Sequence, residues 1–109
     1  LRGVSQKPVK AKPNLAYLRR VRELPCCICE AFGEIQMSPT AAHHVIHGRY
    51  GNLRTADDRA IPLCEGHHQG MLDGTKLALH RAPQQWRNRY GPDTEWTEPT
   101  RDKLGWSGK

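Results

Sequence analysis

Four cysteines and five of the six histidines are confined to three short segments, and this clustering constrains the fold more than any other feature of the sequence. The segments are residues 26–29, 41–47 and 64–68. Thiolates and imidazoles are the ligands that zinc prefers in proteins. A fold that brings these segments together could therefore use a metal ion as part of its core.

The cysteine spacing predicts a structural zinc site. Cys26-x-x-Cys29 has the spacing of a zinc knuckle, in which two thiolates reach one tetrahedral ion, and Cys64-x-x-His67 supplies a matching second half. We predict a closed site of three thiolates and one imidazole, with Cys27 left outside it. About thirty-five residues separate the two halves, which a pair of strands could fill.

Length and composition favour a metal over other ways of stabilising the chain. With 109 residues and 37% hydrophobic content, it forms one small domain that buries little apolar surface. Disulfides suit the pattern poorly, because three cysteines within four residues cannot easily all reach separate partners. No segment resembles a signal peptide, and no run approaches the ~20 apolar residues of a membrane span. We expect a reduced, cytoplasmic protein with no membrane partner.

The charge distribution points to an anionic partner. The net charge is +6 and the pI is near 9.5, which favours nucleic acid. Residues 1–22 carry seven basic residues and no acidic one. We expect residues 1–13 to form a flexible basic arm that follows a phosphate backbone; the alternative is a merely solvated terminus. Because the sequence begins at Leu1 rather than at methionine, further residues of a longer protein could precede it.

Local patterns predict a small α+β domain. Asn14 is a suitable N-cap for a helix that ends before Pro25, with an apolar face towards the core and Arg19 and Arg20 outward. The other expected elements are a strand over Thr40–Ile46, an antiparallel return strand over 59–63, a helix start at Glu65, a helix from Pro83 to Tyr90 closed by Gly91, and a polar tail over 93–109.

The remaining histidines predict a second metal site. Adjacent residues of a strand point to opposite faces, so His43 and His44 cannot ordinarily bind the same ion. One imidazole could hold a metal while the other accepts a proton from water. His67 and His68 show the same division, and His80 is a further candidate ligand. A metal held by two or three histidines keeps open positions for phosphate oxygens and water.

The order of these motifs resembles that of a known family. It runs from the knuckle through Ala-His-His-Val, an Asp-containing loop, Ile-Pro-Leu-Cys-x-x-His-His and a later histidine to an aromatic helix ending in Tyr-Gly. This order resembles HNH endonucleases, and more closely the phage-encoded, RecA-dependent recombination-enhancement nucleases (the Ref family). The resemblance covers residues 15–91, most of the chain.

The resemblance implies a fold, an activity and a set of roles. The fold would be the ββα-metal (His-Me finger) domain over residues 14–92, with a zinc knuckle and flanking helices. The activity would be hydrolysis of DNA by a divalent cation, Mg²⁺ or Mn²⁺, with Zn²⁺ and Ni²⁺ as alternatives. His44 matches the general base, His43 and His68 match metal ligands, and His80 matches the final histidine of the motif. A phage- or prophage-encoded protein of the bacterial cytoplasm, with a RecA-type filament as a possible partner, would follow.

The chain departs from the family pattern at two places. Asp57-Asp58-Arg59 occupies the region where the family usually has asparagine, and we expect Asp57 or Asp58 to hydrogen-bond the His44 imidazole and fix its tautomer. The spacing from His68 to His80 breaks the usual helical pair of ligands. The arginines expected to contact the scissile phosphate are Arg49, Arg54 and Arg59. Arg19 and Arg20 of the first helix are expected to contact nucleic acid as well.

Two other classes of function remain open from the sequence. A zinc-finger module that binds nucleic acid without cutting it would explain the four zinc ligands but leave the other histidines without a role. A zinc-stabilised adaptor between proteins is the third possibility.

Removal of residues 1–13 should weaken DNA binding, because it deletes four positive charges and no proposed catalytic group. DNA affinity should fall and its dependence on salt should become less steep, while turnover of bound substrate changes little. Binding titrations at several salt concentrations measure both effects. An unchanged affinity and salt dependence would assign these residues to a solvated terminus.

Overall fold

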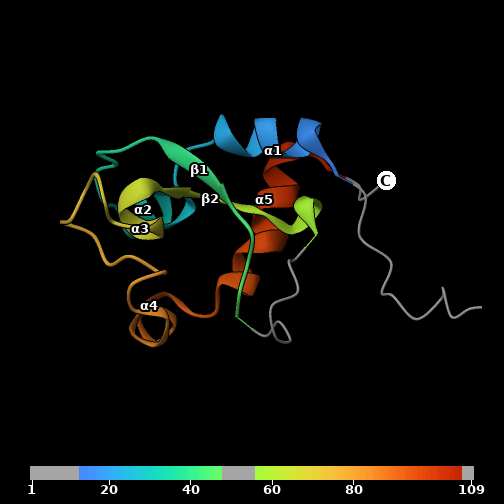
Figure 1. The fold of residues 1–109 in the computed structure, drawn as a ribbon. Coiled ribbons are helices and arrows are strands. Elements are labelled where there is room, and N and C mark those ends of the chain that lie inside the picture. The colour runs from blue at the N-terminus through green and yellow to red at the C-terminus, as the bar shows by residue number, and fades with distance from the viewer. Residues whose placement is uncertain (1–12, 48–55, 107–109) are drawn as a thin grey trace, which may run out of the picture.

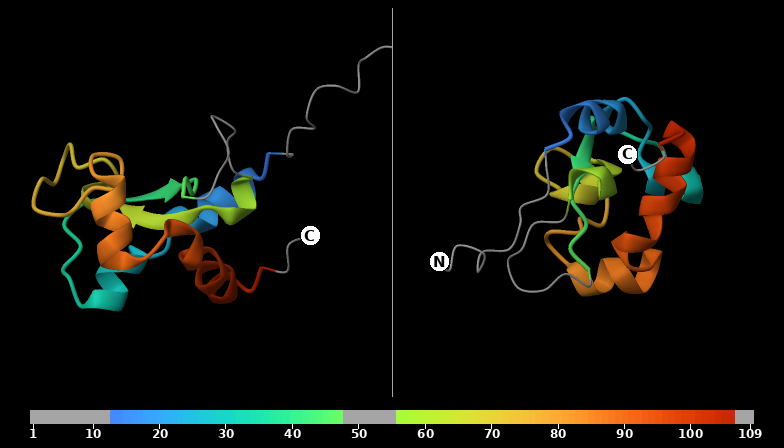
Figure 2. Two further views of the ribbon diagram at one scale, coloured as in Figure 1. Left: turned by 90° about the horizontal axis from the view of Figure 1, so that it is seen from below. Right: turned by 90° about the vertical axis from the view of Figure 1, so that its right-hand side faces the viewer.

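The computed structural model describes residues 13–47 and 56–106, and it has the expected α+β architecture (Figures 1 and 2). The basic arm up to residue 12, Arg49 and Arg54 lie outside the described residues. The elements are α1 (Leu15–Arg22), α2 (Cys27–Phe32), β1 (Thr40–His43), the 3-10 turn η2 (Asp57–Arg59), β2 (Ile61–Cys64), α3 (Glu65–His68), α4 (Pro83–Tyr90), the 3-10 turn η3 (Asp93–Trp96) and α5 (Thr97–Leu104).

A two-stranded antiparallel hairpin lies at the centre of the fold. Thr40 of β1 lies opposite Cys64 of β2, and His43 lies opposite Ile61. Every residue of β2 is buried, and α3 starts directly after it. The hairpin therefore places the end of β1 beside the strand that leads into α3.

The first strand is shorter than predicted, because it ends at His43 rather than at Ile46. The main-chain N–H groups of Ile46 and His47 donate to the carboxylate of Asp93 instead of to a strand. The second strand runs from residue 61 to 64, where the sequence predicts 59 to 63. Buried backbone N–H groups need an acceptor, and here the Asp93 side chain replaces a main-chain oxygen of a neighbouring strand.

The first helix begins where the sequence predicts. The Asn14 side chain accepts a hydrogen bond from the main-chain N–H of Tyr17 at 3.1 Å. Tyr17, Leu18 and Val21 form the buried face, whereas Leu15 is 67% exposed. Tyr17 is drawn inward because its hydroxyl donates to the main-chain oxygen of Ala60 at 3.3 Å.

The C-terminal segment is helical, which corrects the predicted polar tail for residues 93–106. Helix α5 crosses behind the hairpin in Figure 1 and contacts β2. Its buried residues are Thr97, Thr100 and Leu104, so the inward face carries only one apolar side chain. Trp106 packs edge-on against Tyr17, with ring centroids 5.1 Å apart. A mostly polar helix of this kind gives little periodic signal in the sequence.

The fourth helix closes the core around the cysteines. Pro83 occupies its first turn, and Gly91 follows it with a positive φ of 85°, both as predicted. Trp86 and Tyr90 pack together with ring centroids 5.1 Å apart. Both belong to a group of buried side chains that also contains Cys26, Cys29 and Cys64. A separate group of buried side chains surrounds α1. No helix among the described residues is long and apolar enough to cross a membrane.

Leu104→Ala should destabilise the protein, because Leu104 is only 8% exposed and the substitution leaves a cavity against α1. We expect a loss of about 2 kcal/mol or more in the free energy of unfolding. Leu15→Ala, the same change at an exposed site, should cost less than about 0.5 kcal/mol. Urea denaturation measures both, and equal effects would contradict the position of α5.

Candidate functional site

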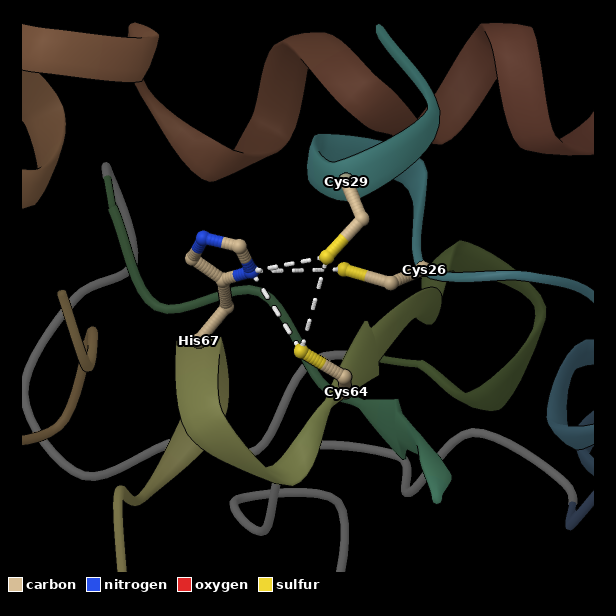
Figure 3. Close-up of side chains that lie close together, drawn as sticks. All are labelled: Cys26, Cys29, Cys64 and His67. Atoms are coloured by element: carbon tan, nitrogen blue, oxygen red, sulfur yellow. Dashed lines mark hydrogen bonds between the residues drawn. The ribbon is translucent and has the colours of Figure 1, made fainter. Parts of the chain in front are cut away.

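The four predicted zinc ligands come together in one buried cluster. Figure 3 shows Cys26 and Cys29 beside α2, Cys64 at the end of β2 and His67 on α3, with their side chains directed towards one another. The Nδ1 atom of His67 lies 3.5 Å from the sulfur of Cys26, 3.6 Å from that of Cys29 and 3.3 Å from that of Cys64. The cluster could hold a metal ion.

These distances suit a tetrahedral zinc ion. Bonds of about 2.3 Å to sulfur and about 2.0–2.1 Å to nitrogen give ideal edges of about 3.8 Å between sulfurs and about 3.6 Å between sulfur and nitrogen. The sulfurs of Cys29 and Cys64 are 3.9 Å apart, and the three sulfur–nitrogen distances lie between 3.3 and 3.6 Å. The residues present therefore fit a zinc ion such as the sequence predicts.

The electrostatics of the cluster favour a cation. A hydrogen bond with Cys26, together with hydrogen bonds and charge from His67, outweighs burial and lowers the pKa of the Cys64 thiol to about 3. The same hydrogen bond and burial raise the pKa of Cys26, and burial raises the pKa of Cys29 to about 11. Without a cation, only one of the three sulfurs carries charge readily. A divalent ion allows all three to be thiolates, which couples metal binding to folding.

A carboxylate orients the histidine of this cluster from the other side. Nε2 of His67 lies 3.2 Å from Oε1 of Glu34, and the Tyr90 hydroxyl donates to Oε2 of Glu34 at 3.3 Å. A carboxylate only accepts hydrogen bonds, so the His67 proton sits on Nε2 and the lone pair of Nδ1 faces the sulfurs. This is the usual arrangement around a metal-binding histidine.

A second cluster, formed by His43, His68 and His80, lies beside the first. One ring nitrogen from each residue lies within 4.8 Å of the others, and the cluster could hold a metal ion. The Nε2 atoms of His68 and His80 are 3.2 Å apart. Burial, together with the neighbouring His43 and His80, lowers the pKa of His68 to about 4. At neutral pH its imidazole is uncharged and can offer a lone pair to a cation.

The loop between α3 and α4 folds back and brings His80 to His68. The carboxylate of Glu65 accepts the main-chain N–H groups of Met71 at 2.6 Å, Leu72 at 2.7 Å and Asp73 at 3.1 Å. The main-chain N–H of His80 donates to the main-chain oxygen of His68 at 3.0 Å. The long spacing that departs from the family motif is thus closed by the loop.

His43 has a buried carboxylate partner that the sequence analysis missed. Its Nε2 lies 2.8 Å from Oδ2 of Asp93, and both side chains are at most 1% exposed. Burial raises the pKa of Asp93, but hydrogen bonds from His43 and from the N–H groups of Ile46 and His47 outweigh burial and lower it below its usual value. Asp93 lies in the segment expected to be a tail, and nothing in its local sequence indicates this contact.

His44 faces a different partner, as the alternation of side chains predicts. Its Nε2 lies 2.7 Å from Oδ1 of Asp57, whose Oδ2 accepts the main-chain N–H of Asn14 at 2.8 Å. The expected hydrogen bond between this imidazole and an aspartate is present, and the acceptor is Asp57 rather than Asp58. The catalytic roles of His44, Asp57 and Asp58 stay predictions.

The remaining predicted residues lie around these clusters. Arg19 and Arg59 are exposed, and Arg20 donates to the main-chain oxygen of Leu104 at 2.5 Å, which ties α1 to α5. Cys27 lies outside the cluster of Cys26, Cys29, Cys64 and His67 (called the zinc cluster from here on), as expected. It lines a pocket between α2 and α5. Burial raises the pKa of the Cys27 thiol to about 12, so it is protonated at neutral pH.

Fold and site together define a small α+β protein with a buried Cys/His cluster that could bind a metal such as zinc. The chain belongs to the family described as "Protein of unknown function (DUF968)", whose model matches residues 6–103. Comparisons with curated proteins and with solved structures found no match.

The purified protein should contain about one tightly bound zinc ion per chain. Cys64→Ser removes one of the four ligands, so zinc content and the melting temperature should both fall sharply. Cys27→Ser makes the same chemical change outside the cluster and should keep the zinc. Elemental analysis and thermal denaturation measure these effects. Folded wild-type protein without zinc would contradict the site.

Proposed function

We propose that this protein is a divalent-metal-dependent endonuclease of the HNH type that hydrolyses phosphodiester bonds in DNA. The observation that carries the proposal is the position of two histidine sites on one hairpin. His43 belongs to a three-imidazole cluster, and its neighbour His44 is held by a carboxylate on the other side. A non-catalytic zinc module would need neither arrangement.

The order of elements also supports the proposal. Two antiparallel strands lead directly into a short helix, and two of the three candidate ligands, His43 and His68, lie at the end of β1 and in α3. This is the ββα order that the resemblance implies. The zinc cluster joins α2, the end of β2 and α3, so the hairpin and α3, which carry His43 and His68, would be held together.

His44 would act as the general base. Because Asp57 accepts the Nε2 proton, the imidazole carries its lone pair on Nδ1, and this atom would take a proton from the attacking water. The side chain of His44 is 18% exposed and that of Asp57 is 14% exposed, so both lie at the edge of the core. Asp57 would also stabilise the imidazolium that forms when His44 accepts the proton.

A divalent cation at the second cluster would stabilise the negative charge that develops on the leaving oxygen. The ligands are three imidazoles, and no carboxylate belongs to the cluster among the described residues. Imidazole suits transition metals, whereas Mg²⁺ prefers oxygen ligands. We therefore favour Ni²⁺ or Zn²⁺ over Mg²⁺ and Mn²⁺ at this site.

The positive charge of the chain supports a nucleic-acid substrate. The net charge of +6 provides a general attraction to DNA, and Arg19 and Arg59 are exposed on the described surface. Sequence specificity has no visible basis in these residues. The expected partnership with a RecA-type filament rests on the resemblance alone and stays a prediction.

His44→Ala should separate an enzyme from a binding module. The substitution removes the proposed base but no zinc ligand, so folding, zinc content and DNA binding should survive. Nicking of supercoiled plasmid should fall by roughly 10²–10⁴, the usual contribution of a positioned general base. His68→Ala should also abolish nicking, and a higher concentration of Ni²⁺ should partly restore it. Wild-type protein that binds DNA and never cuts it with any of these ions would favour the non-catalytic zinc module.

The two adjacent aspartates provide a matched pair for this test. Asp57→Asn exchanges the carboxylate that holds His44, whereas Asp58→Asn makes the same change of charge one residue away. The first should reduce nicking much more than the second. Equal losses would show that general charge, rather than the bond to His44, matters here.

A further inference from the structure

Asp93 is a carboxylate whose described hydrogen bonds all connect to one short segment of the chain. It lies in η3, and its side chain is fully buried. Its Oδ2 accepts from Nε2 of His43 at 2.8 Å and from the main-chain N–H of Ile46 at 2.7 Å. Its Oδ1 accepts from the main-chain N–H of His47 at 3.0 Å. Residues 43–47 are therefore anchored from a position about fifty residues away in sequence.

A fully buried carboxylate such as that of Asp93 is unusual in a protein and needs compensating contacts. Removal of a charged group from water is strongly unfavourable unless hydrogen bonds replace the lost hydration. The donors of Asp93 are the His43 imidazole and two main-chain groups rather than a lysine or arginine. Nδ1 of His47, which accepts the main-chain N–H of Asp93 at 2.9 Å, lies 3.1 Å from Oδ1. Such a set fixes positions more than it neutralises charge.

The zinc cluster contains a matching arrangement. There, Nε2 of His67 faces the carboxylate of Glu34 while Nδ1 faces the sulfurs. In the second cluster, Nε2 of His43 faces the carboxylate of Asp93. Carboxylate partners of this kind orient metal-binding histidines and set which nitrogen holds the lone pair.

We propose that Asp93 is the positioning residue of the second cluster. By accepting the Nε2 proton of His43, it leaves the lone pair of Nδ1 for the cation. By accepting the N–H groups of Ile46 and His47, it ends the first strand at His43 and fixes the segment that carries His44. This inference rests on the proposed cation site and assigns to the C-terminal segment a direct part in building it.

Asp93→Ala should weaken cation binding without removing the zinc. In zinc-loaded protein titrated with Ni²⁺ by calorimetry, we expect affinity to fall by about 10–100-fold, as is typical when the partner of a metal-binding histidine is lost. Asp93→Asn should lose less Ni²⁺ affinity than Asp93→Ala, because its amide oxygen keeps one of the two acceptors that alanine removes. Asp102→Ala, which removes an exposed carboxylate from α5, should bind Ni²⁺ like the wild type.

The tautomer of His43 provides a second measurement that needs neither cation nor activity. Long-range ¹H–¹⁵N correlations of the zinc-loaded wild type should show the His43 proton on Nε2, and Asp93→Ala should lose this preference. A proton on Nδ1 in the wild type would overturn the inference, even if Asp93→Ala fails to fold. Folded Asp93→Ala with wild-type Ni²⁺ affinity would also overturn it, while leaving the proposed function intact. Wild-type protein that binds no Ni²⁺ at the second cluster would instead remove the cation site and the proposed function with it.

Discussion

The convergence of three sulfurs and one imidazole is the constraint on which the rest of this small fold depends. Cys26, Cys29, Cys64 and His67 join α2 to the end of β2 and the start of α3, and all four are buried. In a chain of 109 residues the apolar core alone is small, and a metal ion bound by this cluster would add its binding free energy to folding. The cluster also sets the orientation of α3, from which the second site is built.

Adjacent histidines let one hairpin and one short helix serve two sites. His67 turns towards the sulfurs while His68 turns towards His43 and His80. His43 is buried towards Asp93, and the next residue, His44, turns towards Asp57. Because neighbouring side chains leave the backbone in different directions, a metal ion bound by the Cys/His cluster would also restrain the residues beside it.

Carboxylates hold three of these imidazoles, and each carboxylate comes from a different part of the chain. Glu34 holds His67, Asp93 holds His43 and Asp57 holds His44, in each case at Nε2. Since a carboxylate only accepts hydrogen bonds, these contacts fix where each ring carries its proton and therefore which nitrogen can bind a cation or accept a proton. The chemistry open to the histidines is thus set by the groups behind them.

The sequence by itself determined the four residues of the Cys/His cluster, the antiparallel hairpin and the ends of the first and fourth helices, because cysteine spacing, β-branched runs and capping residues act over a few positions. It left open which aspartate reaches His44, and it misassigned residues 93–106, whose helix buries only one apolar side chain. Only the tertiary structure decided that Asp57 holds His44 and that Asp93 ends the first strand. It also decided that a loop held by hydrogen bonds to Glu65 brings His80 back to His68. These contacts join residues that are distant in the chain, and a polar residue carries no local signal of the partner that folding will bring to it.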